Sequence, residues 1–287
     1  CLFMIVYVCP CLEKEKSLAI MPLVIETLRN SGVTPVLDMN IREVYNDDRA
    51  EYRDERMIVD ECDMILTVGG DGMILKWSKV AAFADKPIIG INTGRLGFMT
   101  ALDADETGLL TAIADGTYSL SRRMMLSAQI DRGGRCTDFT ALNDIVFSKQ
   151  TNSKLPEFTV RINGIKVTEV RADGMIFSTP TGSTAYALAA GGPVIEPTVE
   201  CILLTPLCAH TMLSRPMIFS GNDTVSVSCA MYEGSRVNMS VDGGAGIEIS
   251  ESDVITIRKS GVMLRVVEIN GRSFYGAVSE KLMAPLK

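Results

Sequence analysis

The stretch Cys62–Phe83, CDMILTVGGDGMILKWSKVAAF, joins a run of apolar residues to a glycine-rich turn and then to good helix formers. The apolar run Cys62–Val68 predicts a buried strand, and Asp71–Phe83 predicts a helix. Buried strands that alternate with helices build parallel sheets with helices on both faces. The stretch therefore predicts an α/β domain.

The segments around this stretch repeat the alternation up to about residue 120. Further strands are predicted at residues 2–8, 33–39 and 86–92. Helices are predicted over Glu13–Asn30 and over residues 103–116, where Asp103 is the expected N-cap and Gly116 the expected end. We therefore expect residues 1–120 to form an α/β domain with a parallel sheet.

Beyond about Ser121 the apolar residues alternate with a period of two. EFTVRING, residues 157–164, places apolar side chains on one face before an Asn163-Gly164 hairpin turn, and residues 223–232 and 236–243 alternate likewise. Residues 121–268 are expected to form a β-rich, antiparallel, sandwich-like domain. The exception is TGSTAYALAAGG, residues 181–192, whose middle predicts one or two helical turns.

The final segment, residues 269–287, is predicted to contain a strand and a short helix. It could pack back on either domain, and we name the N-terminal domain as the candidate.

Composition excludes several classes of partner and site. The 28 basic and 35 acidic residues give a net charge of −7, which argues against a general affinity for nucleic acid or anionic membranes. The longest uncharged stretch, Gly174–Ile195, contains two prolines and four glycines and is not a membrane span. Eight scattered cysteines without a C-x-x-C pair argue against a zinc site or a disulfide framework. We therefore expect a reducing, cytoplasmic location.

The glycine turn after the predicted strand contains an apparent contradiction. Gly69, Gly70 and Gly72 allow the backbone to approach a phosphate, whereas the carboxylate of Asp71 repels one. The turn is at a strand end and a helix start, which is where ligands bind in open α/β sheets. The alternative is that Asp71 only caps the helix.

A second candidate stretch is RADGMIFSTPTGSTAYALAAGGP, residues 171–193, which combines a strand with small hydroxyl and glycine residues. Such residues permit close backbone contact with a polar ligand. The alternative is a tight chain crossing between sheets.

Several motifs together resemble the NAD kinase family in their order and approximate spacing. They are GGDG at 69–72, NTGRLGF at 92–98, ND at 143–144, RADG and STPTGSTAY within 171–186, HTMLSRP at 210–216 and SFYGAVSEKL at 273–282. The likeness covers nearly the whole chain. TPTGSTAY is the specific element, because GGDG also occurs in diacylglycerol-kinase-like and phosphofructokinase-like enzymes.

The resemblance implies two domains with NAD bound between them. The implied reaction transfers the terminal phosphoryl group of ATP, or of another donor such as polyphosphate, to the 2′-hydroxyl of the adenosine ribose of NAD, which gives NADP. A divalent cation, usually Mg²⁺, accompanies the donor, and the sequence assigns no metal ligands. The resemblance also implies a homodimer or homotetramer.

Roles follow for individual residues of the first motif. Phosphoryl transfer needs an oriented hydroxyl that loses its proton as the new bond forms, and Asp71 is the candidate general base. His210, the single histidine, is expected to have a structural role. Gly69 and Gly70 would offer N–H groups to the phosphates, and Gly72 is expected to contact NAD.

Positive charge for an anionic donor must be found locally in this acidic chain. Lys76, one helical turn and a residue beyond Asp71, and Arg95 in NTGRLGF are the candidates, with Lys76 assigned to NAD and Arg95 to the donor. A solvated surface position is the alternative for both. Met73 and Ala209 depart from the family pattern and leave ATP and polyphosphate open as donors.

The remaining NAD contacts are implied by matches to the later motifs. The residues expected to contact NAD are Asn143, Asp144, Arg171, Asp173, Thr181, Thr184, Ala185, Tyr186, Ala187, Leu188 and Ala189. Asp242, in a VDGG sequence, is either a further site residue or part of a hairpin turn. Two rival functions are a lipid or sugar kinase that uses the same GGDG turn and a non-catalytic NAD(P)-binding protein.

Overall fold

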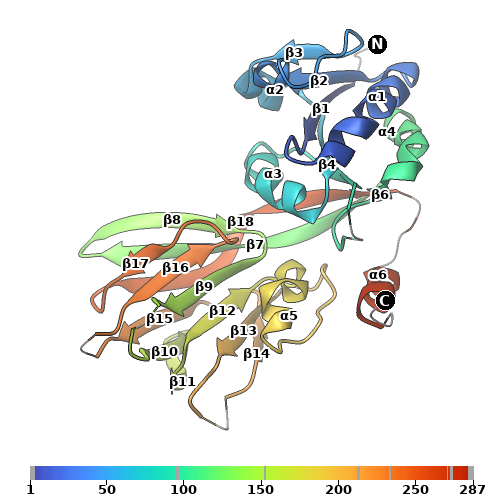
Figure 1. The fold of residues 1–287 in the computed structure, drawn as a ribbon. Coiled ribbons are helices and arrows are strands. Elements are labelled where there is room, and N and C mark those ends of the chain that lie inside the picture. Colours follow the sequence, from blue (N-terminus) through green and yellow to red (C-terminus); the bar gives the residue numbers. More distant parts are fainter. Residues whose placement is uncertain are drawn as a thin grey trace. The chain divides into compact units, whose positions relative to one another are not determined.

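Figure 1 shows the computed structural model, which describes residues 4–94, 97–151, 153–211, 214–232, 234–269, 271 and 274–283. The chain divides into two compact units. Unit 1 comprises Cys1–Arg122 and Leu264–Lys287, and unit 2 comprises Arg123–Met263. The chain leaves unit 1 within strand β7 (Ser119–Arg132) and returns within β18 (Val254–Glu268).

The sheet of unit 1 is parallel, as predicted. Its strands are β1 (Ile5–Pro10), β2 (Thr34–Asp38), β3 (Glu51–Arg53), β4 (Met64–Gly69), β5 (Ile88–Asn92) and β6 (Leu102–Asp103). The order is β3-β2-β1-β4-β5, and β6 and the end of β18 also pair with β5 in parallel. The pairing of Val266 with Ile88 accounts for the place of the last residues of β18 in unit 1.

The helices of unit 1 agree with the predicted ones and add two short elements. They are α1 (Glu15–Asn30), η1 (Met39–Ile41), α2 (Glu55–Glu61), α3 (Asp71–Phe83), η2 (Ala104–Leu110), α4 (Thr111–Asp115) and α6 (Phe274–Met283). The predicted helix over 103–116 is divided into η2 and α4. Glu106 accepts a hydrogen bond from the backbone N–H of Asp103 at 2.9 Å, and Gly116 ends α4 with φ +65°. Strand β18 ends at Glu268, and the strand predicted after it falls partly on residues 270, 272 and 273, which lie outside the described residues.

Helices cover both faces of this sheet (Figure 1). Alternate residues of a strand point to opposite faces. On one face, Val8 and Leu66 share a buried cluster with Val24 of α1. On the other face, the rings of Tyr7 in β1 and Trp77 in α3 meet edge to face, with centroids 5.0 Å apart.

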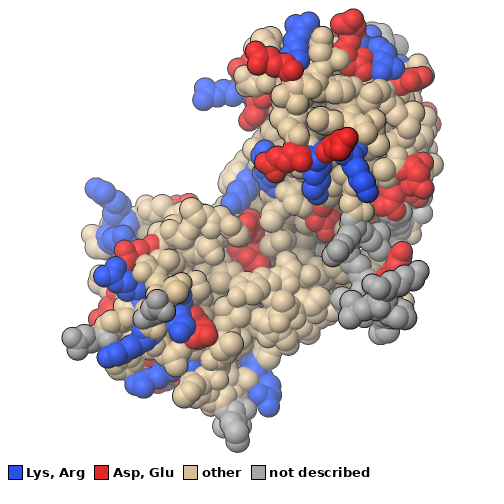
Figure 2. Space-filling model, in the orientation of Figure 1, with Lys and Arg blue, Asp and Glu red and all other residues tan. Residues whose placement is uncertain are grey.

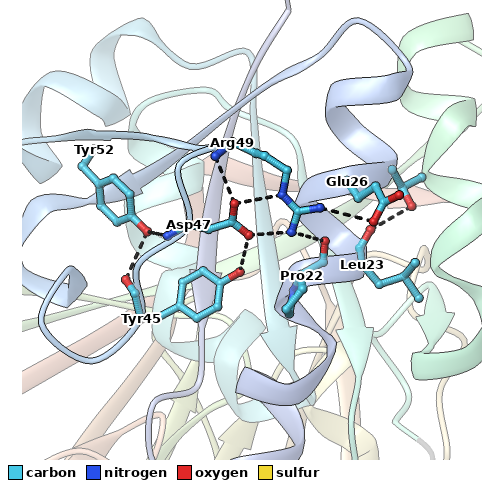
Figure 3. A network of polar contacts seen from close by, with 8 residues as sticks. Pro22, Leu23, Glu26, Tyr45, Asp47, Arg49 and Tyr52 are labelled. Carbon is cyan, nitrogen blue, oxygen red and sulfur yellow. Dashed lines mark hydrogen bonds and ion pairs between the residues drawn. The ribbon is translucent and has the colours of Figure 1, made fainter.

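A network of polar contacts ties the segment between β2 and β3 to α1 (Figure 3). Arg49 donates from Nε and Nη2 to the two carboxylate oxygens of Asp47, at 2.9 and 2.7 Å, and Nη2 also lies 3.2 Å from the carbonyl of Pro22 in α1. The hydroxyl of Tyr45 donates to Asp47, and that of Tyr52 accepts from the Asp47 backbone N–H. The Arg49 guanidinium lowers the pKa of Asp47 to about 2.

Unit 2 contains two antiparallel sheets. The strands of the first are β8 (Arg135–Ala141), β10 (Glu157–Ile162), β11 (Ile165–Arg171) and β15 (Val225–Ala230), together with β7 and β18. The strands of the second, in spatial order, are β14 (Met217–Ser220), β13 (Cys201–Leu207), β12 (Gly174–Ser178), β9 (Asp144–Lys149), β16 (Val237–Val241) and β17 (Ile247–Ile249). The 3₁₀ helix η3 (Thr181–Thr184) and helix α5 (Tyr186–Ala189) follow β12, which confirms the predicted helical turns.

The core of unit 2 lies between its two sheets. Phe158 of β10 and Val227 of β15 share one buried cluster with Phe147 of β9 and Phe177 of β12. The predicted antiparallel sandwich is therefore confirmed. The predicted hairpin turn at Asn163-Gly164 joins β10 and β11 with φ of +50° and +83°, the conformation that a two-residue primed turn requires.

Three further observations concern the surface charge, the helices and the thiols. On the face shown in Figure 2, the blue basic side chains and the red acidic side chains lie among one another. Within the described residues, every helix is too short or too polar to cross a membrane. The seven cysteines of the described chain are free thiols.

Candidate active site

A cavity of about 960 Å³ lies in unit 1 at the carboxyl ends of β1 and β4. These strands are neighbours at the centre of the sheet, where the order turns from β1-β2-β3 to β4-β5. Loops that leave such strands diverge and open a crevice, which is where ligands bind in open α/β sheets. Pro10 and Cys11 line the cavity from the β1 side, and Gly69 and Gly70 line it from the β4 side.

The glycine turn delivers the start of α3 to this cavity. Gly70 has φ +152° and ψ −174°, a conformation that is essentially restricted to glycine. Asp71 is the first residue of α3, the Met73 N–H donates to the Gly70 carbonyl at 2.9 Å, and the N–H groups of Asp71 and Gly72 precede this first hydrogen bond of the helix. The predicted residues Gly72 and Lys76 line the same cavity.

The carboxylate of Asp71 is held by the loop that follows β5. Oδ2 accepts the backbone N–H of Phe98 at 2.7 Å, and Oδ1 accepts that of Met99 at 3.1 Å. A Cβ on Gly97 would lie 2.1 Å from Oδ1, so only glycine permits this approach. The side chain of Asp71 therefore has a defined orientation.

The alternative that Asp71 only caps α3 does not agree with these contacts. The residue at the N-cap position is Gly70, and no side-chain hydrogen bond caps the helix. The Asp71 carboxylate instead contacts a different segment of the chain, 27 and 28 residues away in sequence.

Two lysines bring positive charge to the cavity. Lys76 extends from α3, and Lys14 extends from the segment between β1 and α1. The ammonium nitrogen of Lys14 lies 4.0 Å from the point that a Cβ on Gly70 would occupy. Lys14 is not among the residues predicted from the sequence, although its place just after the first strand was the available signal. Arg95 lies outside the described residues.

The rest of the cavity wall combines aromatic and acidic side chains. Tyr7 and Trp77 form the aromatic part, and burial raises the pKa of Tyr7 well above its usual value. Glu13, Asp38 and Glu55 are the acidic residues that line the cavity besides Asp71. The cavity therefore offers both charge signs and a flat apolar surface.

A polar cluster in unit 2 gathers two of the predicted NAD contacts, Asn143 and Asp144, around Asp242. The Asp242 carboxylate accepts the backbone N–H groups of Leu142, Asn143 and Asp144 at 3.0, 2.8 and 3.2 Å. The Thr179 hydroxyl donates to the Leu142 carbonyl at 2.6 Å, and the Thr179 backbone N–H donates to the Asn143 carbonyl at 2.9 Å. The predicted ND and TPTGSTAY motifs are thus adjacent.

Asp144 is unusual among the carboxylates of this cluster. Its side chain is buried, and this desolvation, with the nearby charge of Asp242, raises the pKa of Asp144 to about 7. Buried polar groups normally have hydrogen-bond partners. Asn143 Oδ1 and Thr181 Oγ1 are buried and have no hydrogen-bond partner among the described residues, which suits contact with a ligand or with water.

The other residues of the TPTGSTAY match differ in exposure. Tyr186 and Ala189 are exposed, and Thr184, Ala185 and Leu188 are half-buried. Ala187 is instead fully buried in an apolar cluster, and its carbonyl accepts the N–H of Gly192 at 2.8 Å. The methyl group of Ala187 packs within this apolar cluster, so the structure does not place Ala187 at a ligand.

The structure separates Arg171 and Asp173 from this cluster. They precede β12, whereas Thr181 follows it, and an extended strand of this length spans about 17 Å. Arg171 lies over the ring of Tyr232, with its guanidinium carbon 4.4 Å from the ring centroid, and Asp173 pairs with Lys149 at 3.3 Å. His210 is exposed and donates its backbone N–H to the Arg171 carbonyl.

Comparisons with known proteins agree for both halves of the chain. Residues 13–118 match the ATP-NAD kinase N-terminal domain, and residues 142–269 match the ATP-NAD kinase C-terminal domain. The NAD kinase of Desulforamulus reducens is 37% identical over 254 residues, covering 85% of this chain and 88% of that protein. The NAD kinase of Caldanaerobacter subterraneus is 34% identical over 277 residues, covering 96% and 97%.

Two solved structures have a similar fold. An NAD kinase from Archaeoglobus fulgidus in complex with ATP has a TM-score of 0.73 and 27% identity, covering 96% of this chain and 98% of that chain. Yeast NADH kinase complexed with NADH has a TM-score of 0.85, covering 98% and 88%, and its 24% identity makes this a likeness of fold. The alternative of a lipid or sugar kinase loses its support, because both halves of the chain match ATP-NAD kinase domains. This chain therefore belongs to the NAD kinase family.

Proposed function

We propose that this enzyme transfers the terminal phosphoryl group of ATP to the 2′-hydroxyl of the adenosine ribose of NAD, with Asp71 as the general base. The observation that carries the proposal is the oriented carboxylate of Asp71 beside a glycine turn at the N-terminus of α3. Binding alone does not require a carboxylate next to phosphates, whereas deprotonation of a hydroxyl does.

The proton has a defined acceptor in this proposal. A carboxylate oxygen has two lone pairs, and the N–H groups of Phe98 and Met99 each occupy one. A free lone pair of Asp71 accepts the ribose O–H proton while the hydroxyl oxygen bonds to the γ-phosphorus. The bond between that phosphorus and the β,γ-bridging oxygen breaks, and ADP leaves with the electron pair.

The groups around Asp71 suit the phosphates. N–H groups at the start of α3 and the ammonium groups of Lys14 and Lys76 supply positive charge where the phosphates approach. The presence of ATP in the related Archaeoglobus fulgidus structure supports ATP as the donor. Polyphosphate is the alternative donor, because charge alone does not select a nucleotide.

The carboxylates of the cavity fit a divalent cation such as Mg²⁺. Mg²⁺ prefers oxygen ligands and usually takes only one or two from protein carboxylates, with water and phosphate oxygens as the rest. Asp71, in the glycine turn, is the carboxylate that would hold the cation. Within the described ranges, no three or more metal-binding side chains form a group, which fits a cation held by few protein ligands. When bound, the cation would neutralise the charge of the donor phosphates.

For NAD, the polar cluster of unit 2 supplies the proposed contacts. Asn143 Oδ1 and Thr181 Oγ1 would gain hydrogen-bond partners, and Tyr186 offers an exposed ring for stacking on a base. We also propose a cytoplasmic location, in keeping with the free thiols, and a homodimer or homotetramer, which light scattering of the purified protein would measure.

The test compares Asp71→Asn with the parent enzyme in NADP formation from NAD, Mg²⁺ and ATP or polyphosphate. A lost general base lowers turnover by about 10²- to 10⁴-fold. The variant is expected to show that loss and to keep much of its affinity for NAD, although its amide can accept only one of the two N–H groups that orient the carboxylate, so part of the loss reports on orientation. The parent enzyme should form NADP with ATP, and the polyphosphate arm decides the donor.

Asp54→Asn is the matched control. Asp54 is the N-cap residue of α2 in unit 1. Its carboxylate accepts the backbone N–H of Arg56, and asparagine can fill the same role. Turnover of this variant should equal that of the parent. Full activity in Asp71→Asn would show that another group accepts the proton.

A further inference from the structure

Two buried hydroxyl groups lie behind the turn that precedes Asp71. Ser17, in α1, is fully buried, and Thr93, directly after β5, is 7% exposed. Their oxygen atoms are 3.1 Å apart. Neither residue lines the large cavity, so neither is placed to touch a ligand there.

Both hydroxyls reach the last two carbonyls of β4. Ser17 Oγ lies 3.0 Å from the carbonyl oxygen of Val68, and Thr93 Oγ1 lies 3.0 Å from that of Gly69. The same carbonyls also accept the backbone N–H groups of Cys11, at 2.8 Å, and of Thr93, at 3.3 Å. The end of β4 is therefore held by α1 and by the segments that follow β1 and β5.

The two hydroxyls share three contacts, two to carbonyls and one between Ser17 and Thr93, for which they supply two protons. When each hydroxyl donates to its own carbonyl, the contact between the two oxygens holds no proton. When one hydroxyl donates to the other, one carbonyl keeps only its backbone N–H donor. Every arrangement therefore leaves both carbonyls at the strand end with a hydrogen-bond donor.

We propose that Ser17 and Thr93 are positioning residues that fix the place of Asp71 in the reaction. Gly69, which Thr93 holds, is two residues before Asp71, and Gly70 between them connects the strand end directly to α3. The hydroxyls fix the main chain, while the loop after β5 fixes the carboxylate. This inference rests on the proposed role of Asp71.

The physical effect of losing the hydroxyl pair is a shift of the base. Without Thr93 Oγ1, the Gly69 carbonyl keeps only the longer bond from the Thr93 backbone N–H. Displacement of a catalytic group by about 1 Å can cost about 10²-fold in rate. Because neither hydroxyl lines the cavity, the loss should lower kcat and leave substrate binding unchanged.

The experiment compares Thr93→Val, which removes the hydroxyl at nearly constant volume, with Thr93→Ser, which keeps it. Thr93→Val is expected to lower kcat by about ten-fold or more, with KM values for NAD and ATP within about two-fold of the parent. Thr93→Ser should restore kcat to within about two-fold. Ser17→Ala is a second variant that also lowers kcat, in case Thr93→Val does not fold.

Thr67→Val is the matched control. Thr67 is fully buried in β4, and its hydroxyl donates to the carbonyl of Ile89 in β5 at 3.3 Å, two residues before the strand end. Replacing threonine by valine at position 67 likewise removes one buried hydroxyl that bridges β4 and β5. It should lower the melting temperature as Thr93→Val does and leave kcat unchanged.

Three results would overturn the inference: an unchanged kcat in folded Thr93→Val, an equal kcat loss in Thr67→Val, or no recovery in Thr93→Ser. Combination with Asp71→Asn separates this inference from the role of Asp71. If the hydroxyls act through Asp71, Thr93→Val should cost little more turnover when Asp71 is already asparagine. If Asp71→Asn alone is fully active, the base assignment fails, and a kcat loss in Thr93→Val then reports on another group.

Discussion

Gly97 limits the position of the Asp71 carboxylate through a direct close approach. Gly97→Ala would place a methyl group 2.1 Å from Asp71 Oδ1 and 2.7 Å from Thr100 Oγ1, so the carboxylate must move. We expect a loss of about 10- to 100-fold in kcat, measured as NADP formation. Gly108→Ala, where a Cβ meets no atom within 4 Å, should retain full activity, and equal kcat in the two variants would refute this reading of Gly97.

Asp144 makes stability depend on pH. Its carboxyl ionises near 3.8 in the unfolded chain and near 7 in the folded protein. Between these values the folded state binds more protons, so the free energy of unfolding falls as the pH rises. The shift corresponds to a loss on the order of 2 kcal/mol between pH 5 and pH 8.

Urea unfolding of the parent and of Asp144→Asn at these two pH values measures that loss. Asparagine cannot ionise, so the variant should lose correspondingly less stability between pH 5 and pH 8. An equal loss in both proteins would mean that Asp144 ionises at an ordinary pKa.

Single residues also show what the sequence could reveal. The glycines, Asp71 and Lys76 were identifiable because they are close together in one strand, turn and helix. Lys14 was not, because its approach to Gly70 depends on β1 lying beside β4, which is a property of strand order. The Asp242 contacts have the same origin, since they join residues about 100 positions apart.

At the scale of elements, Arg49 determines how firmly the segment between β2 and β3 is held. Its planar guanidinium contacts both oxygens of Asp47 while also reaching Glu26 and the Pro22 carbonyl of α1. A lysine cannot reproduce this fork. Since the Arg49 side chain is 43% exposed, we expect Arg49→Lys to lower the free energy of unfolding only slightly.

Urea denaturation measures this change. Arg29→Lys, at an exposed position in the last turn of α1, is the control and should unfold like the parent. If both lysine variants are equally stable, the bidentate pair contributes nothing measurable.

Elements with strong local signals were predicted well. The bounds predicted for α3, Asp71–Phe83, are those observed, and the predicted Glu13–Asn30 helix begins two residues later, at Glu15. Residues 40–61 carried no prediction, yet they contain β3 and α2. These elements have only three and seven residues, too few for a periodic pattern to stand out.

At the scale of the whole molecule, the two fold types were predictable and the way the chain is shared between them was not. Apolar periodicity distinguishes the helix-covered parallel sheet from the antiparallel sandwich. It does not show that β18 begins in unit 2 and ends beside β5 of unit 1, because that pairing joins Val266 to Ile88 across most of the chain.

The two crossings of the chain have a consequence for how the protein is made. Unit 1 needs the strand end at Val266, which leaves the ribosome only after the 141 residues of unit 2 have been synthesised. At about 5–20 residues per second, that interval is roughly 7–30 s. During this delay β5 lacks one of its neighbours and exposes part of a buried edge. The sheet that carries Asp71 therefore stays incomplete throughout the synthesis of unit 2, whose last residue, Met263, is only three positions before Val266.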